Sequence, residues 1–135
     1  MVCIIIRGTP GSGKSSFAEL FEGFVICEAD SYFIRSESRS PFKGEYKFDA
    51  SKLGKAHDFC RTKFIQALKE GRNVLIANTS TTRQERDFYS KAAKQAGYMV
   101  FSVVVENLFG NSNIHGVPTD KVQSMRDKLR NNLDL

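Results

Sequence analysis

Residues 2–15, VCIIIRGTPGSGKS, join an apolar run rich in β-branched residues to a glycine-rich turn that ends in Lys-Ser. The apolar run, Val2–Arg7, is typical of a buried strand. The turn fits the pattern G-x-x-x-x-G-K-[ST], which binds nucleotide phosphates when a strand precedes it and a helix follows it. Its glycines allow successive backbone N–H groups to point inwards at a phosphate, and the start of the helix adds partial positive charge. The segment therefore predicts the opening strand, phosphate-binding loop (P-loop) and helix of an α/β domain.

The residues of this loop have distinct expected tasks. Lys14 should reach the β- and γ-phosphates of ATP, and the Ser15 hydroxyl should hold Mg²⁺. The remaining residues are expected to surround the phosphates, and they are Gly8, Pro10, Gly11, Ser12, Gly13 and Ser16. The motif predicts nucleotide binding without indicating what the nucleotide is used for.

Strands and helices alternate along the rest of the chain. Further strands are predicted at 24–27, 73–77 and 99–105, and helices at 14–21, 49–70, 82–96 and from Thr119 onwards. The side chains expected to point inwards from the helices are Phe17, Leu20 and Phe21; Leu53, Ala56, Cys60, Phe64, Ala67 and Leu68; Phe88, Ala92 and Ala96; and Val122, Met125 and Leu129. Such alternation predicts parallel βαβ units in a single domain, residues 1–135, with helices on both faces of the sheet.

Composition and charge narrow the class of protein. The chain has 135 residues, 41% of them hydrophobic, and no apolar run approaches the length of about 20 residues that spans a bilayer. We expect a cytoplasmic protein without a membrane partner, because the apolar N-terminus runs into the glycine motif without a cleavage site. Cys3, Cys27 and Cys60 lack metal-type spacing and are expected to be buried free thiols. The net charge of +5 favours an anionic partner.

A P-loop needs an acidic partner for metal or water, and no Asp follows the third predicted strand, which ends Ala77-Asn78-Thr79. The second strand ends instead in Glu28-Ala29-Asp30. Because the carboxyl ends of parallel strands share one edge, Asp30 should face the loop, where it could accept the proton of an attacking hydroxyl or hold metal together with Ser15. An Asp at this position could equally cap the following turn. The absence of an Asn-Lys-x-Asp motif argues against a switch-type GTPase.

Several motifs between Ile4 and about Met125 indicate a resemblance to a known family. They are the loop itself, Asp30-Ser31-Tyr32, Tyr46-Lys47-Phe48-Asp49, Asn78-Thr79 and residues 113–118, NIHGVP. In these motifs the chain resembles the phage-type polynucleotide 5′-kinase family and its short AAA-type, P-loop kinase-like relatives. The resemblance implies a P-loop kinase fold with four or five parallel strands, and transfer of the γ-phosphoryl group of ATP to the 5′-hydroxyl of DNA or RNA. It further implies that Asp30 is the general base and that Thr79 lines the acceptor site, next to Asn78.

Two features leave the activity open. A basic stretch begins at Arg35, which we expect to contact acceptor phosphates, although interleaved acidic residues also fit a plain solvated loop. Ser112 stands where the family has an arginine that contacts the transferring phosphate, and Arg83 is the expected replacement. The alternatives are a kinase for a small acceptor such as a nucleoside, and an ATP-binding module with little transfer activity.

Overall fold

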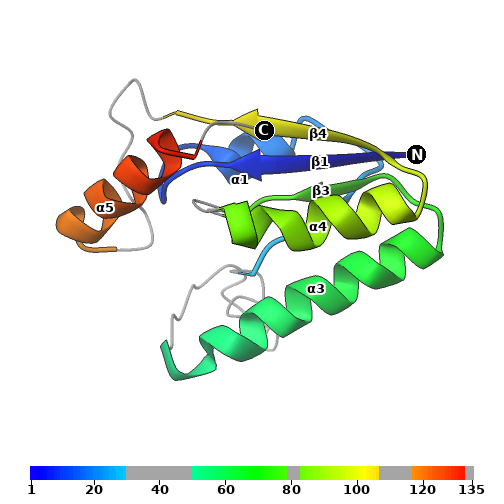
Figure 1. Ribbon diagram of the computed structural model, residues 1–135, viewed down its shortest axis with the longest axis horizontal. Helices are drawn as coiled ribbons and strands as arrows, with labels where there is room; N and C mark the ends of the chain where they lie inside the picture. Colours follow the sequence, from blue (N-terminus) through cyan, green and yellow to red (C-terminus); the bar gives the residue numbers. More distant parts are fainter. Residues whose placement is uncertain (30–49, 79–82, 107–116, 133–135) are drawn as a thin grey trace, which may run out of the picture.

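The structure is a computed structural model that describes residues 1–29, 50–78, 83–106 and 117–132. Its centre is a parallel sheet of four strands, in the order β2-β3-β1-β4. The strands are β1 (Val2–Arg7), β2 (Val25–Cys27), β3 (Val74–Ile76) and β4 (Met99–Val104). Cys3 of β1 stands opposite Val74 on one side and Val100 on the other. The predicted α/β class and parallel sheet are confirmed, and all strands end at the same edge (Figure 1).

The helices divide between the two faces of the sheet. They are α1 (Lys14–Ala18), α3 (Leu53–Lys69) with a short 3-10 turn before it (η1, Ala50–Lys52), α4 (Arg83–Gln95) and α5 (Thr119–Arg130). α3 and α4 cover one face and α1 covers the other, whereas α5 lies beyond the carboxyl ends of the strands (Figure 1). No helix in the described ranges is both long enough and apolar enough to cross a membrane.

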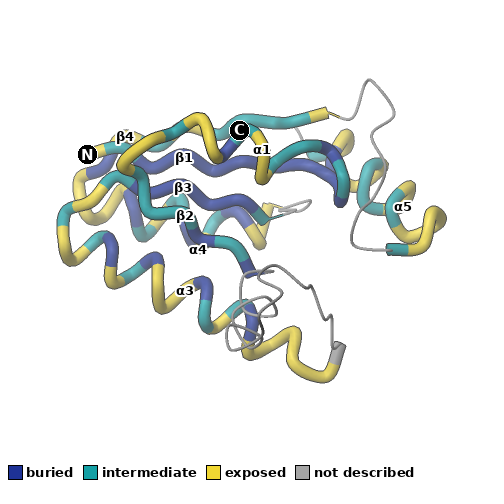
Figure 2. The backbone as a smooth tube through the Cα atoms, turned by 180° about the vertical axis from the view of Figure 1, so that it is seen from behind, coloured by how far each residue is buried: buried dark blue, intermediate teal, exposed yellow. Residues whose placement is uncertain are grey.

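Alternation along the strands produces two core clusters. Cys3 and Ile5 of β1 face α3 and α4, where they join Phe64 and Tyr89. Ile4 and Ile6 face α1. The central strands are buried on both faces, which is why β3 is a continuous apolar run (Figure 2). The three cysteines are buried and free, as predicted.

The prediction for the first helix was partly wrong. α1 ends at Ala18, and the chain continues to Phe21 through turns in which the N–H groups of Leu20 and Phe21 bond to carbonyls three residues earlier. Phe17 and Phe21 pack inwards as predicted, with ring centroids 5.4 Å apart. Leu20 is 74% exposed, because the helical periodicity that would have turned it inwards stops before it.

Three other expectations about side-chain direction also need correction. Leu53 is exposed at the first residue of α3. On α4, Tyr89 and Ala93 are buried in place of Phe88 and Ala96, which are exposed. The buried face is therefore rotated by one residue, because the polar tip of Tyr89 finds partners inside the core.

The last helix begins as predicted but is buried less than expected. Its N-cap is Pro118, without a side-chain capping bond. Leu129 is buried, whereas Val122 and Met125 are only half-buried. This follows from the position of α5, which faces the end of the sheet and not one of its broad faces.

Candidate nucleotide-binding site

The P-loop leaves β1 at the carboxyl edge and depends on three glycines. A Cβ atom at Gly8 would lie 2.5 Å from Ser12 Oγ and 2.7 Å from the Val105 carbonyl oxygen, so a side chain does not fit there. Gly11 and Gly13 have φ angles of 78° and 100°, which other residues rarely adopt. The loop backbone can therefore curl closely around a small anion.

The donors of the loop are arranged to receive phosphate. α1 begins at Lys14 and its N-cap, Gly13, provides no side-chain bond, so the N–H groups of the first turn have no acceptor within the helix. The Lys14 ammonium lies over the loop and donates a hydrogen bond to the Thr9 carbonyl, 2.9 Å away. The start of α1 and the Lys14 ammonium thus lie at the same turn, an arrangement that suits a phosphate group.

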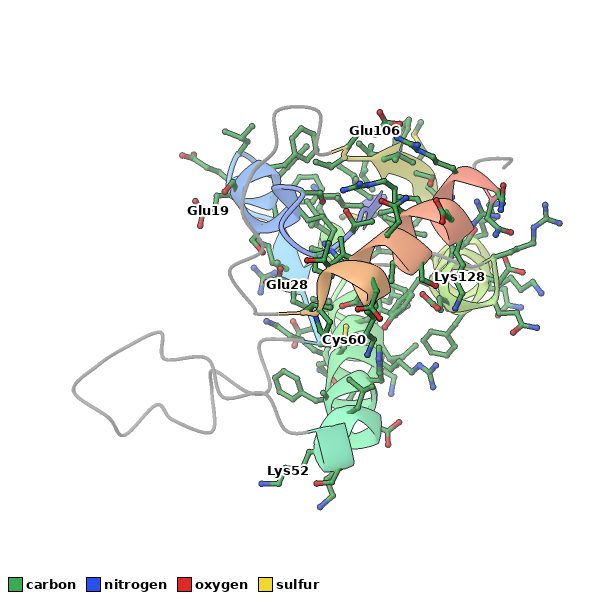
Figure 3. The ribbon with its side chains drawn as sticks, turned by 90° about the vertical axis from the view of Figure 1, so that its left-hand side faces the viewer. Glu19, Glu28, Lys52, Cys60, Glu106 and Lys128 are labelled. Carbon is green, nitrogen blue, oxygen red and sulfur yellow. The ribbon has the colours of Figure 1, made fainter. Side chains whose placement is uncertain are left out.

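The hydroxyl of Ser15, on the first turn of α1, is held by an acidic partner. Ser15 Oγ donates a hydrogen bond to Glu28 Oε1, with a distance of 2.6 Å. Glu28 directly follows β2, and its side chain lies on the α1 side of the sheet because it is two residues after Ile26, which also packs there. Figure 3 looks onto the carboxyl ends of the strands and shows Glu28 near the start of α1.

A second polar group at this edge is the side chain of Asn78, two residues after β3. Asn78 Oδ1 accepts a hydrogen bond from the backbone N–H of Ala29, with a distance of 2.9 Å. Its amide nitrogen donates to Cys60 Sγ and Tyr89 Oη, both at 3.5 Å. Asn78 therefore joins the end of β2 to α3 and α4.

The buried thiols and phenol of this region remain neutral. Burial raises the pKa of Cys3 and of Cys27 to about 12. Burial also raises the pKa of Cys60 and outweighs the hydrogen bonds to Tyr89 and Asn78, which lower it. The pKa of Tyr89 is raised by burial and by its contact with Cys60. These groups are consequently core residues and not nucleophiles at neutral pH.

The predicted site residues fall into three groups. The loop residues, from Gly8 to Ser16, form one turn at the edge, and Asn78 lies at the same edge. Arg83 is the exposed first residue of α4. Asp30, Arg35, Thr79 and Ser112 lie outside the described residues.

Two sets of hydrogen bonds at the site could not be predicted from the sequence pattern. They are the bond from Ser15 to Glu28 and the bonds of Asn78 across the strand ends. The position of Glu28 directly after an apolar strand was an available signal, whereas its pairing with Ser15 depends on the fold. Among the described residues, no group of three His, Cys, Asp or Glu could hold a metal ion. A cation here would therefore rely on few protein oxygens together with phosphate.

Known proteins match both the sequence and the fold. Residues 3–107 match the model of a family described as AAA domain. Human NEDD4-binding protein 2 is 28% identical over 137 residues, which cover 93% of this chain and 7% of that protein. The 2′,3′-cyclic-nucleotide 3′-phosphodiesterase of Rattus norvegicus is 33% identical over 73% of this chain and 22% of its own length. A putative bifunctional polynucleotide kinase/RNA ligase of Autographa californica nuclear polyhedrosis virus is 24% identical over 70% of this chain and 15% of its own length.

The chain therefore spans less than a quarter of each of these relatives. Two solved structures share its fold at low sequence identity. The APS kinase CysC of Mycobacterium tuberculosis superposes with a TM-score of 0.52 and 20% identity, over 96% of both chains. A chain of the Pnkp1/Rnl/Hen1 complex superposes with a TM-score of 0.59 and 18% identity, over 90% of this chain and 38% of that chain.

Proposed function

Because the chain belongs to the AAA domain family of P-loop kinase-like proteins, we propose that it transfers the γ-phosphoryl group of ATP to the 5′-hydroxyl of a polynucleotide. The observation that carries this proposal is the loop from Gly8 to Ser16, with the Lys14 ammonium above it and the Ser15 hydroxyl bonded to a carboxylate. The loop and the Lys14 ammonium suit a bound triphosphate, part of whose charge Lys14 would neutralise.

The proposed reaction assigns one task to each group. The acceptor oxygen forms a bond to the γ-phosphorus, the bond to the bridging oxygen breaks, and ADP leaves. Lys14 is proposed to exchange its bond to Thr9 for the phosphates, and Asp30 to take the proton of the acceptor hydroxyl. Bound Mg²⁺, for which Ser15 and Asp30 are the proposed ligands, would neutralise phosphate charge. Arg83, at the start of α4, is proposed to supply the guanidinium that Ser112 lacks.

A polynucleotide acceptor is supported by the names of two relatives. One is named as a polynucleotide kinase/RNA ligase and the other as a cyclic-nucleotide phosphodiesterase, so nucleotide chemistry recurs among proteins that share this domain. The net charge of +5 also favours an acceptor that carries several phosphates.

The deciding experiment is transfer from γ-labelled ATP to a panel of acceptors: 5′-hydroxyl DNA, 5′-hydroxyl RNA, nucleosides and nucleoside monophosphates. We expect label on the oligonucleotides. Lys14→Ala should abolish transfer, Asp30→Asn should slow it by about 10²–10⁴-fold with little change in ATP affinity, and Arg83→Ala should slow it strongly. Lys91→Ala, an exposed lysine on α4, is the matched control and should leave the rate unchanged.

Each other outcome selects an alternative. Label on nucleosides alone would identify a small-acceptor kinase. ATP binding without label on any acceptor would identify an ATP-binding module, in agreement with the serine at position 112.

A further inference from the structure

The carboxylate that a P-loop protein needs for its magnesium ion is missing from the usual strand. β3 lies directly beside β1, and the residues after it are Ala77, which is buried, and Asn78, whose amide is used in bonds to Ala29, Cys60 and Tyr89. Neither offers a negative charge. The acidic partner must therefore come from another element at the carboxyl edge.

Within the described part of this edge, the carboxylate that meets the loop comes from β2, one strand further out. Strand alternation turns Glu28 to the α1 side of the sheet, and its Oε1 lies 2.6 Å from Ser15 Oγ. A hydrogen bond of this length to a carboxylate is strong and charge-assisted. Glu28 is thus already bonded to the residue that the motif assigns to the metal.

We propose that Glu28 is an acidic residue of the magnesium site in addition to Asp30, a role that nothing in the loop motif assigns to it. This inference rests on the proposed ATP binding and adds a residue to that site. Because the Ser15 proton is directed at Glu28, the lone pairs of its hydroxyl face away and remain available to a cation. The second carboxylate oxygen of Glu28 could accept a hydrogen bond from a water bound to that cation.

The chemistry of Mg²⁺ fits such a sparse site. The ion prefers six oxygens, keeps several waters, and is commonly held by one or two carboxylates together with substrate phosphates. The Ser15 hydroxyl, the carboxylates of Glu28 and Asp30, the phosphates of a nucleotide and several waters would satisfy that preference. Glu28 orients Ser15 and supplies negative charge, so its effect should appear in metal binding whether or not phosphoryl transfer is fast.

The test measures metal and nucleotide binding separately, using Glu28→Gln, which keeps the shape and removes the charge. Mn²⁺ binding in the presence of ADP is followed by electron paramagnetic resonance, and ATP affinity is measured by calorimetry with Mg²⁺ and with EDTA. We expect Mn²⁺ affinity to fall by about 10–100-fold, as for other residues that orient a metal ligand. Metal-free ATP should bind as well as to the wild type or more tightly, because a negative charge near the phosphates has been removed.

The matched control is Glu19→Gln, an exposed glutamate at the end of α1, which should change neither affinity. Equal Mn²⁺ affinity in Glu28→Gln and the wild type would overturn the proposal. So would equal weakening of MgATP and metal-free ATP, which would mean that Glu28 only maintains the loop. A different outcome is metal-dependent ATP binding by the wild type that Glu28→Gln weakens, but no transfer to any acceptor. That result would count against the kinase function and would leave the Glu28 assignment standing.

Discussion

At the scale of single residues, the site depends on polar side chains that bridge strand ends. The turn from Gly8 to Ser15 could be predicted because its glycine spacing, with a strand before it and a helix after it, is typical of a P-loop. The hydrogen-bond partners of Glu28 and Asn78 could not be predicted, because each bond joins residues that only the folded sheet brings together. Glu28 lies 13 residues from Ser15, and Asn78 lies 49 residues from Ala29. Local sequence patterns identify the residues that follow the strands at the carboxyl edge of the sheet. They do not identify which of these residues form hydrogen bonds with one another.

The first prediction concerns Asn78, whose oxygen holds the N–H of Ala29, the residue before Asp30. Asn78→Ala leaves that part-buried donor without its acceptor, which typically costs about 1–3 kcal/mol in the free energy of unfolding. If Asp30 is the general base, misplacing the adjacent backbone should also lower kcat by more than it changes ATP affinity. Denaturant unfolding and transfer kinetics measure the two effects.

Asn73 provides the control for this prediction. Its Oδ1 accepts a bond from the N–H of Val2, 2.9 Å away, at the opposite edge of the sheet. Asn73→Ala should reduce stability by a similar amount and leave kcat unchanged at a temperature where both variants are folded. Equal losses of kcat in the two variants would assign Asn78 a role in stability alone.

At the scale of elements, the strands were easier to predict than the faces of the helices. Buried strands are short apolar runs, so their predicted limits agree with the structure to within one residue. The face of α4 was misjudged because hydrophobicity favours Phe88 over Tyr89, whereas the core accepts Tyr89 through its bond to Cys60 Sγ at 3.4 Å. The burial of a polar-tipped side chain depends on the partner that the neighbouring helix provides.

The second prediction tests how strongly α3 and α4 are fixed to the sheet. Phe64 of α3 is fully buried, and its ring lies 5.0 Å from that of Tyr89 in an edge-to-face contact. Phe64→Ala should lower the free energy of unfolding by about 3–5 kcal/mol, as expected for truncation of a buried aromatic residue. Phe101→Ala, on the half-exposed outer strand, should cost far less, since 47% of Phe101 is already exposed. Comparable losses in the two variants would mean that the α3–α4 face is not the main core.

At the scale of the whole molecule, the parallel sheet gathers the candidate site at one edge. The loop, Glu28 and Asn78 all follow strand ends, and α5 lies beyond the same edge (Figures 1 and 3). α5 carries four basic residues, Lys121, Arg126, Lys128 and Arg130, against two acidic residues, Asp120 and Asp127. α5 therefore carries an excess of positive charge beyond the edge where the loop lies, and this charge would attract a polyanion bound at the loop.

The last prediction asks whether the basic stretch that begins at Arg35 and includes Arg39 contacts a polynucleotide. Binding of a single-stranded oligonucleotide should weaken with salt, with a log–log slope of about −0.7 for each phosphate contact. Reversing Arg35 and Arg39 to glutamate should remove two such contacts and flatten the slope by about 1.4, with little effect on ATP affinity. Fluorescence anisotropy over a range of salt concentrations measures the slope.

The control variant is Lys69→Glu with Lys94→Glu, which changes the net charge by the same amount. Both lysines lie in the last turns of α3 and α4, helices that end where the next strand begins, at the edge opposite the loop. If the slope arises from contacts with individual phosphates, the Lys69→Glu and Lys94→Glu variant should have nearly the same slope as the wild type. Equal flattening in both double variants would show that net charge alone attracts the oligonucleotide, and an acceptor with few phosphates would then be favoured. A steep slope that only the Arg35 and Arg39 reversal flattens would mean that the polynucleotide contacts these two arginines.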